Sequence, residues 1–328
     1  MSVPFSEDEM IETMFAPLAG QGGLGLKDDA ALVSPPAGQE LVLTTDAIVA
    51  GVHFFADDPP ESLARKALRV NLSDLAAKGA DPLGFLLTLA LPGDMLADWL
   101  TRFAAALGAD ARQYGIDLLG GDTVKTPGPA MISITALGHV PVGQMVPRTG
   151  ARAGDALYVS GAIGDAALGL MVRSDAVFSR RLSAPARAHL LTRYLVPQPR
   201  NALARVMRDC ADGGMDVSDG FVGDCAKMLR VSGVSGQIDL SKVPLSDAAR
   251  EAIVLDATLF DRALTGGDDY ELLASVPPER AADFERRAAS CGVAVSRVGT
   301  VVAGLSAPAF LGLDGAPRQF ANSSYSHF

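Results

Sequence analysis

The chain has 328 residues, of which 48% are apolar and 20% charged, and these values are typical of a globular protein with about two domains. A formal net charge of −10 argues against a nucleic-acid partner, and three widely spaced cysteines argue against a disulfide or zinc framework. The longest apolar stretch, 83–91, is too short to span a membrane and the acidic N-terminus does not resemble a signal peptide, so we expect a soluble, cytoplasmic protein.

The first half of the chain alternates strands and helices. Apolar runs predict strands over residues 41–45, 83–91, 116–119 and 131–140, and helical periodicity predicts helices over 61–78 and 95–114. The first strand would place Asp46 at its carboxyl end, and the third would run into Gly120, Gly121 and Asp122. The apolar face of the second helix, 96–107, is compatible with a subunit contact.

The second half begins after a segment rich in Pro, Gly and Arg, 141–154, and we expect domains over 1–149 and 150–328. Strands are expected over 156–160, 215–217, 270–276 and 293–301, with helices after Gly164, within 184–210, and over 221–231 and 281–290. Because several strands follow one another directly, we expect an α+β fold: two α/β domains with mixed sheets and helices on one side.

Several acidic clusters stand out, and most of them fall at strand ends or glycine turns, where functional groups concentrate in α/β proteins. They are Asp28 and Asp29, Asp46, Asp74, Asp122, Asp216 with Asp219, and Asp268 with Asp269. Each has an ordinary explanation when taken alone: Asp219 can cap the helix that follows, Asp122 can close a turn, and Asp74 can be solvated. This explanation is weakest for Asp74, because its apolar neighbours indicate a buried helix, and a lone buried carboxylate is costly.

Together these carboxylates suit magnesium, which takes oxygen ligands and is shared between a few carboxylates and the phosphates of a substrate. Phosphoryl transfer needs aligned reactants and neutralised charge more than it needs a covalent catalyst. Since the chain is acidic, a phosphate substrate would also require cations between it and the protein.

Competing motifs do not fit. No GK[ST] phosphate loop and no GxSxG elbow occur, and the four histidines do not pair at metal-ligand spacing. The GxGxxG match at 20–25 follows a helical segment, 10–18, rather than a strand, and we interpret it as a loop that matches by chance.

The acidic motifs occur in a specific order: KDDAA at 27–31, TTD at 44–46, NLSDLAA at 71–77, GGDT at 120–123, DVSDG at 216–220 and GGDDYEL at 266–272. In order and spacing they resemble the thiamine-monophosphate kinase family, within an ATP-binding superfamily that includes aminoimidazole ribonucleotide synthetase. The resemblance runs from about Gly25 to the last residues. It implies magnesium-assisted, direct transfer of the γ-phosphoryl group of ATP to thiamine monophosphate, giving thiamine diphosphate. It also implies a homodimer, with an N-terminal domain that dimerises and binds ATP and metals, and a C-terminal domain that closes over the site.

The resemblance further implies roles for individual residues. Several Mg²⁺ ions would be coordinated by Asp29, Thr44, Thr45, Asp46, Asp74, Asp122, Asp216 and Asp219. ATP would contact Gly121, Asp122, Arg148 and Ser218, and thiamine monophosphate would contact His53 and Asp268. His53 could instead pack on Phe54, and Arg148 could be a solvated loop cation.

The sequence departs from the family pattern in three places. Lys27 and Lys78 stand where the family usually has glycine and methionine, and we hypothesise that their charges help to neutralise phosphate. The ending, 324–328, matches only in part, which leaves Phe320 and Tyr325 as the two candidates for an aromatic contact with thiamine monophosphate.

Two alternatives remain open. One is another enzyme of the superfamily, either an aminoimidazole ribonucleotide synthetase or a selenophosphate synthetase, although the latter needs a reactive cysteine near the N-terminus and the first here is Cys210. The other is a non-catalytic nucleotide-binding scaffold, although the chain lacks the C-terminal cysteine tail typical of hydrogenase-maturation relatives.

Overall fold

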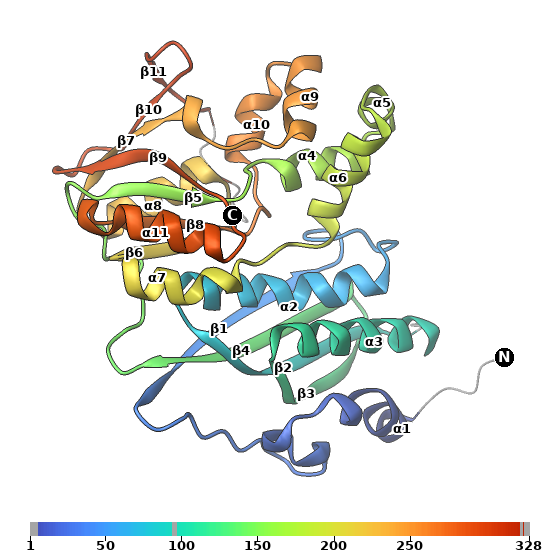
Figure 1. Ribbon diagram of the computed structural model, residues 1–328. Helices are drawn as coiled ribbons and strands as arrows, with labels where there is room; N and C mark the ends of the chain where they lie inside the picture. Colours follow the sequence, from blue (N-terminus) through green and yellow to red (C-terminus); the bar gives the residue numbers. More distant parts are fainter. Residues whose placement is uncertain (1–5, 94–96, 322–323, 325–328) are drawn as a thin grey trace. The chain divides into compact units, whose positions relative to one another are not determined.

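The structure is a computed structural model that describes residues 6–93, 97–321 and 324 (Figure 1). Its internal contacts divide it into two units: an N-terminal unit, 1–75 with 80–143, and a C-terminal unit, 76–79 with 144–328. The limits 1–149 and 150–328 stay a prediction. No helix in the described ranges is long and apolar enough to cross a membrane, and the cytoplasmic location also stays a prediction.

The N-terminal unit is built on a four-stranded mixed sheet. Its strands are β1 (Gln39–Val49), β2 (Asp81–Pro92), β3 (Asp117–Thr126) and β4 (Met131–Pro141), in the order β1-β4-β2-β3. β2 and β3 are parallel, whereas β4 is antiparallel to both β1 and β2. A mixed sheet is what the sequence predicts for this half.

The two faces of this sheet differ. We call the side that carries Ile132, Ile134 and Ala136 of β4 the buried face, because these side chains pack in one core with helices α2 (Pro60–Ala77) and α3 (Ala97–Tyr114). We call the other side, which carries Thr45 and Leu86, the open face. Side chains alternate along β4 between the two faces, as expected for a sheet covered by helices on one side.

The apolar face of helix α3, whose sequence pattern was compatible with a subunit contact, is buried within its own unit over the described residues. Leu100, Phe103 and Leu107 are all buried in the core of their own unit, where they pack beneath the sheet. The helix therefore closes the buried face, and the first residues of the expected segment, Met95 and Leu96, lie outside the described residues.

The N-terminal segment forms short helical turns beside β3. These are α1 (Glu7–Met10), a π-helical turn (Ile11–Phe15) and two 3-10 turns (Ala16–Leu18 and Gln21–Leu26). The backbone N–H of Gly20 donates to the carbonyl of Leu118 on β3. The GxGxxG segment thus follows helical turns rather than a strand, as the sequence suggested, and its interpretation as a chance match stays a prediction.

The C-terminal unit is built on a seven-stranded mixed sheet with the order β11-β10-β7-β9-β5-β8-β6. The strands are β5 (Ala156–Ser160), β6 (Gly213–Val217), β7 (Ser235–Asp239), β8 (Glu271–Val276), β9 (Val295–Val302), β10 (Ala309–Leu311) and β11 (Pro317–Arg318). Only β7 and β10 pair in parallel among the paired strands of this sheet.

Helices cover both faces of this second sheet. They are α4 (Asp165–Ser174), α5 (Ala176–Arg181), α6 (Ala184–Leu195), α7 (Ala204–Cys210), α8 (Phe221–Val231), α9 (Asp247–Leu255), α10 (Leu259–Thr265) and α11 (Pro278–Ser290). On β5, Leu157 packs in the same core as Met228 of α8, whereas Tyr158 packs in another core with Phe284 of α11. The expectation of helices on one side is therefore wrong for this unit, and strands β5, β6 and β8 are buried throughout because both faces are covered.

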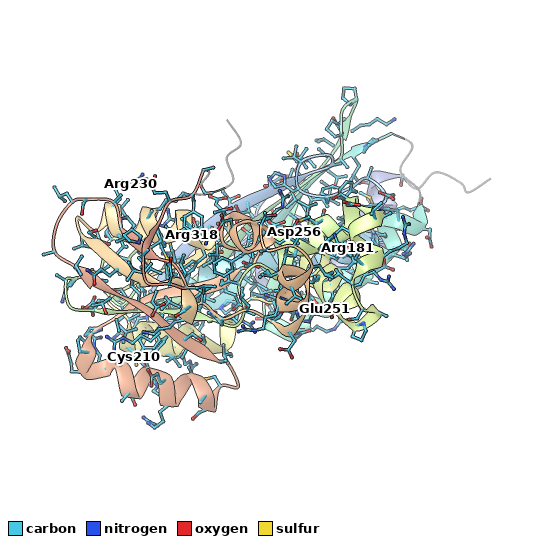
Figure 2. All side chains as sticks on the ribbon, turned by 90° about the horizontal axis from the view of Figure 1, so that it is seen from above. Arg181, Cys210, Arg230, Glu251, Asp256 and Arg318 are labelled. Carbon is cyan, nitrogen blue, oxygen red and sulfur yellow. The ribbon has the colours of Figure 1, made fainter. Side chains whose placement is uncertain are left out.

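Polar contacts join helices α5, α6 and α9 of the C-terminal unit, and two of the residues that make them, Arg181 and Glu251, are labelled in Figure 2. The guanidinium of Arg181 donates to the carbonyl of Leu255, at 3.0 Å, and so joins α5 to α9. The carboxylate of Glu251 on α9 accepts hydrogen bonds from both the backbone and the hydroxyl of Ser183, the residue that caps α6.

Candidate functional site

The N-terminal unit contains a cavity of about 710 Å³. One wall is the loop that carries Asp28 and Asp29, both exposed, and another is the stretch of β3 from 120 to 123. The open-face residues Leu86 and Thr88 of β2 and Thr135 of β4 also line it. The cavity therefore joins two of the predicted acidic motifs, which lie more than 80 residues apart in the sequence, through the parallel pairing of β3 with β2.

Gly121 is required by the sheet itself, before any ligand is considered. A Cβ at this position would lie 1.8 Å from the carbonyl oxygen of Leu87, so only glycine lets β3 approach β2 this closely. The motif that contains Gly121 and Asp122 lies inside β3, not in a turn after a shorter strand as the sequence suggested. β3 continues to Thr126 because β2 pairs with it along its whole length.

A second group lies on the buried face of β1. The hydroxyl of Thr44 donates to the Asp74 carboxylate on α2, with Oγ1 and Oδ2 2.5 Å apart. Asp46 lies two residues further along β1, and is therefore directed to the same face. It is not at the end of the strand, as predicted, because β4 pairs with β1 as far as Val49.

Thr45 belongs to the opposite face. Its hydroxyl donates to the carbonyl of Ile134 and accepts from the hydroxyl of Thr135, an open-face residue that lines the cavity. The three consecutive residues of the TTD motif therefore do not present their side chains to one point within this unit.

The two acidic groups of the N-terminal unit are separated by the width of the sheet. Asp46 is paired with Ile134, Ile134 with Leu87, and Leu87 with Gly121, so β1 and β3 are three strand spacings apart, or roughly 14 Å. Among the described residues no three His, Cys, Asp or Glu side chains lie close enough to hold a metal ion by themselves. The donors are nevertheless carboxylate and hydroxyl oxygens, and Mg²⁺ commonly binds through one or two carboxylates plus substrate phosphates. The donor set fits magnesium on this basis.

His53 lies in the turn that follows β1. Its Nδ1 accepts a hydrogen bond from the backbone N–H of Val49 at 3.1 Å, and its carbonyl accepts one from the buried ammonium of Lys66 at 3.1 Å. These contacts fix the imidazole against the end of the strand, and they also give His53 a structural role that needs no substrate.

In the C-terminal unit, a buried aspartate organises the DVSDG turn. Asp224, which is fully buried on α8, accepts hydrogen bonds from the backbone N–H groups of Ser218 and Asp219, at 3.1 and 2.9 Å. Burial raises the pKa of Asp224, and these backbone donors and the nearby ammonium of Lys227 act in the opposite direction. Lys227 also contacts the carboxylate of Asp219 at 2.5 Å. Asp219 does not cap the following helix, because Gly220 occupies the N-cap position.

Asp216 and Asp268 flank the same turn. Asp216 lies on β6 and is buried, with 4% of its surface exposed. The backbone N–H of Asp268 donates to the carbonyl of Ser218 at 2.8 Å, which brings the GGDDYEL and DVSDG motifs side by side.

The structure gives less support to the ligand contacts predicted for the other residues, which are Arg148, Phe320, Tyr325 and Lys78. Arg148 is exposed, and its carbonyl accepts a hydrogen bond from the hydroxyl of Ser232 at 3.2 Å. Phe320 packs edge-on against Phe310, with ring centroids 5.8 Å apart, at the margin of a core. Tyr325 lies outside the described residues. Lys78 donates to the carbonyl of Gly214 at 2.8 Å, which gives it a structural role besides the hypothesised neutralisation of phosphate.

The chain matches the family described as AIR synthase related protein, with the N-terminal domain over residues 27–140 and the C-terminal domain over 152–307. A thiamine-monophosphate kinase from Caulobacter vibrioides is 40% identical to it, over 94% of this chain and 88% of the relative. The chain belongs to the thiamine-monophosphate kinase family.

Other members of the thiamine-monophosphate kinase family are also similar to this chain over most of its length. The kinase of Escherichia coli strain K12 is 38% identical over 93% of this chain and 92% of its own. The crystal structure of the Stenotrophomonas maltophilia kinase has a TM-score of 0.80 at 36% identity, and covers 89% of this chain and 91% of that one. A structure described as AaThiL complexed with AMPPCP and TMP has a TM-score of 0.77 at 29% identity, over 100% of this chain and 99% of that one.

The hydrogenase maturation protein HypE in complex with ATP has a TM-score of 0.79 but is only 20% identical, so it shares the fold alone. Family membership at up to 40% identity thus favours the kinase over the scaffold and over the other superfamily enzymes.

Sequence reasoning missed Asp224 and Lys227, which hold the DVSDG turn. Their signal is in the sequence: they follow Asp219 by five and eight residues, on the helix that starts at Phe221. An acidic and a basic residue three positions apart on one helix can face the same turn. No motif matched them, because their role is to bind the backbone and side chain of the motif itself.

Proposed function

We propose that this chain transfers the γ-phosphoryl group of ATP to thiamine monophosphate, giving thiamine diphosphate and ADP. The observation that carries the proposal is the full-length likeness to AaThiL, which has been described with both AMPPCP and TMP bound. The cavity beside Asp28, Asp29 and Asp122 supports it, because exposed carboxylates beside closely packed glycine backbone suit a metal-bound triphosphate.

We further propose that Mg²⁺ is held by Thr44, Asp46 and Asp74 on the buried face of the N-terminal sheet, by Thr45, Asp29 and Asp122 on the side of the open face and the cavity, and by Asp216 and Asp219 of the C-terminal unit. When bound, Mg²⁺ would neutralise the triphosphate and the charge that develops on the moving phosphoryl group. The hydrogen bond from Thr44 to Asp74 fixes one carboxylate oxygen in advance, and Asp224 and Lys227 do the same for the turn that carries Asp219.

The reaction needs no covalent intermediate with the protein. A phosphate oxygen of thiamine monophosphate attacks the γ-phosphorus of ATP, one phosphoanhydride bond forms, the β–γ bridging bond breaks, and ADP leaves with the bridging oxygen. The chain aligns the two phosphates, with Gly121, Arg148 and Ser218 on the ATP side and His53 and Asp268 on the acceptor side. Trapping of a phosphorylated enzyme with ATP alone would contradict direct transfer.

We also propose that the protein is a homodimer that pairs through the open face of the N-terminal sheet. Leu43, Leu86 and Val124 are exposed there, at 61%, 39% and 44%, although apolar. The acidic groups of one protomer lie on opposite faces of its sheet. A second protomer on the open face would add its own acidic groups to those on that face. Leu43→Glu should convert a dimer into a monomer in sedimentation velocity, whereas Val254→Glu, at an 86% exposed position in the other unit, should not. A wild-type monomer would refute this arrangement.

The activity itself is tested by release of ADP from ATP and Mg²⁺ with thiamine monophosphate, with free thiamine and with neither. Release that depends on thiamine monophosphate, with thiamine diphosphate as the product, is the expected result. Binding of ATP without any turnover of thiamine monophosphate would refute the proposed acceptor and leave the fold unaffected.

A further inference from the structure

The GxGxxG segment, 20–25, has no part in the function proposed above, yet its backbone is unusual. Leu24 and Gly25 have φ values of +52° and +69°, and Leu26 follows with +55°, so three successive residues lie in the left-handed region. Leucine seldom adopts this conformation, and such strain persists only where the surroundings hold the backbone in place. The turn is therefore held by contacts outside itself.

The start of the segment is held against β3. The backbone N–H of Gly20 donates to the carbonyl of Leu118 at 3.0 Å, and Ala19 forms an isolated parallel bridge with the same residue. Gly23 is buried, and a Cβ on it would lie 3.0 Å from the carbonyl oxygen of Leu119. The segment therefore lies directly on the strand that forms one wall of the cavity.

The segment continues into a closed loop, residues 22–32, which we call the acidic loop because it carries Asp28 and Asp29. Its ends meet where the backbone N–H of Leu32 donates to the carbonyl of Gly22 at 2.8 Å. A Cβ at Gly22 would lie 2.5 Å from the carbonyl oxygen of Leu32 and 3.2 Å from a methyl carbon of Leu119, so the closure requires glycine. Compact loops whose ends meet in this way are frequently functional.

Between its ends the acidic loop is anchored by Leu26. This side chain is partly buried, packs against the hydrophobic core of the N-terminal unit and also lines the cavity, whereas Leu24 is 46% exposed. Asp28 and Asp29 follow at once and line the cavity as well. The left-handed turn thus brings the chain from β3 to a core contact and then to the cavity wall within a few residues.

We propose that the GxGxxG segment positions the acidic wall of the cavity, and that Gly22 is the positioning residue: it closes the acidic loop and so holds Asp28 and Asp29 where a metal-bound nucleotide would meet them. This inference rests on the proposed function. Gly22 does not itself line the cavity, so it acts through the place of the loop. If the closure is lost, the loop is in this place for only a fraction of the time, and the apparent Kd for nucleotide rises by the inverse of that fraction.

Two variants open the acidic loop by different routes. Gly22→Ala places a methyl group against the Leu32 carbonyl, and Leu32→Pro removes the N–H that donates to Gly22. Leu32→Ala is the matched control, because it keeps the N–H and alters only a side chain that is 70% exposed. Gly299→Ala is the control for overpacking itself, because a Cβ there would lie 2.3 Å from the carbonyl oxygen of Gln237, between β9 and β7 of the other unit.

The readouts are Kd for AMPPCP with Mg²⁺ by calorimetry, KM for ATP and for thiamine monophosphate, and amide hydrogen exchange of residues 24–31 in the ligand-free protein. One backbone hydrogen bond biases a local equilibrium by roughly 5-fold. Leu32→Pro should therefore raise Kd for AMPPCP and KM for ATP about 5-fold, and Gly22→Ala at least as much. Exchange over 24–31 should be faster in both variants, and KM for thiamine monophosphate should stay within about twofold.

The controls should separate position from stability. Gly299→Ala should lower Tm and Leu32→Ala should not, and both should keep the wild-type Kd for AMPPCP and the wild-type exchange over 24–31. Should Gly22→Ala not fold, Leu32→Pro decides, because it changes an exposed position and adds no atom to a packed region.

The proposal is overturned if the loop variants bind AMPPCP with the wild-type Kd, if Leu32→Ala weakens binding as much as Leu32→Pro does, or if the loop variants leave exchange over 24–31 unchanged. Failure of the proposed function is separate from these results, because it would be seen in the wild-type protein, as ADP release that does not depend on thiamine monophosphate.

Discussion

The wall of the cavity formed by β3 can be tested at Gly121. In Gly121→Ala the new methyl group would lie 1.8 Å from the carbonyl oxygen of Leu87, whereas contacts under 3.0 Å are essentially never found. Because the obstacle is the backbone of β2 rather than a flexible side chain, β3 must move by more than an ångström or lose part of its pairing with β2.

Overpacking of this kind costs about 2 kcal/mol, which corresponds to a Tm lower by roughly 4–8 °C for a domain of this size class. The same movement displaces Asp122, on the cavity wall, from its position. Since a misplacement of about 1 Å can slow a reaction roughly 100-fold, kcat/KM for ATP should fall by a similar factor.

Thermal unfolding followed by circular dichroism, together with ADP release, measures both effects. Gly128→Ala is the control, because this glycine is in the turn after β3 and a Cβ there would have no neighbour closer than 3.5 Å. If Gly121→Ala kept both the wild-type Tm and the wild-type kcat/KM for ATP, the argument that β3 and β2 need glycine at this contact would be wrong.

Two further predictions concern buried polar groups. Asp110→Ala removes the carboxylate bound at 2.5 and 3.0 Å by the buried Arg69, so the free energy of unfolding in urea should fall by about 3–5 kcal/mol. Asp98→Ala, which removes a 78% exposed side chain paired with Arg102, should cost less than about 1 kcal/mol, and equal losses would contradict this. Burial, and then the hydrogen bond to Glu285, raises the pKa of Tyr158 to about 12. Since the unfolded tyrosine ionises near pH 10, the folded state keeps a proton that the unfolded state has lost, and stability should fall as pH rises from about 10 to 12. Tyr158→Phe should abolish that part of the decline, and an unchanged pH profile would refute the assignment.

Elements with a strong local pattern were predicted within a residue or two. The strand at Ala156–Ser160 and the helix at Phe221–Val231 have the bounds expected from the sequence, and the helix at Pro60–Ala77 differs by one residue at each end. Strands β7, β10 and β11 and helices α5, α9 and α10 were not predicted. They are short, and their existence depends on neighbours that are distant in the sequence.

Strand ends were the least predictable feature, because pairing rather than propensity determines them. Asp46 and the Gly121–Asp122 pair were expected just beyond strands, yet both lie inside them, where β4 and β2 supply hydrogen-bond partners. The difference matters for the site, because the pleat of a strand directs each side chain inside it to one of the two faces of the sheet.

The sequence by itself determined which chemical groups the protein has and in what order, and that order was enough to indicate the kinase family and its candidate ligands. Only the tertiary structure decided that Thr44 and Thr45 face opposite sides of a sheet. It also decided that β1 and β3 lie three strands apart, and that Asp224 binds the backbone of the DVSDG turn. The physical reason is that a residue's chemistry is local, whereas the direction of its side chain depends on register, burial and pairing with residues far along the chain.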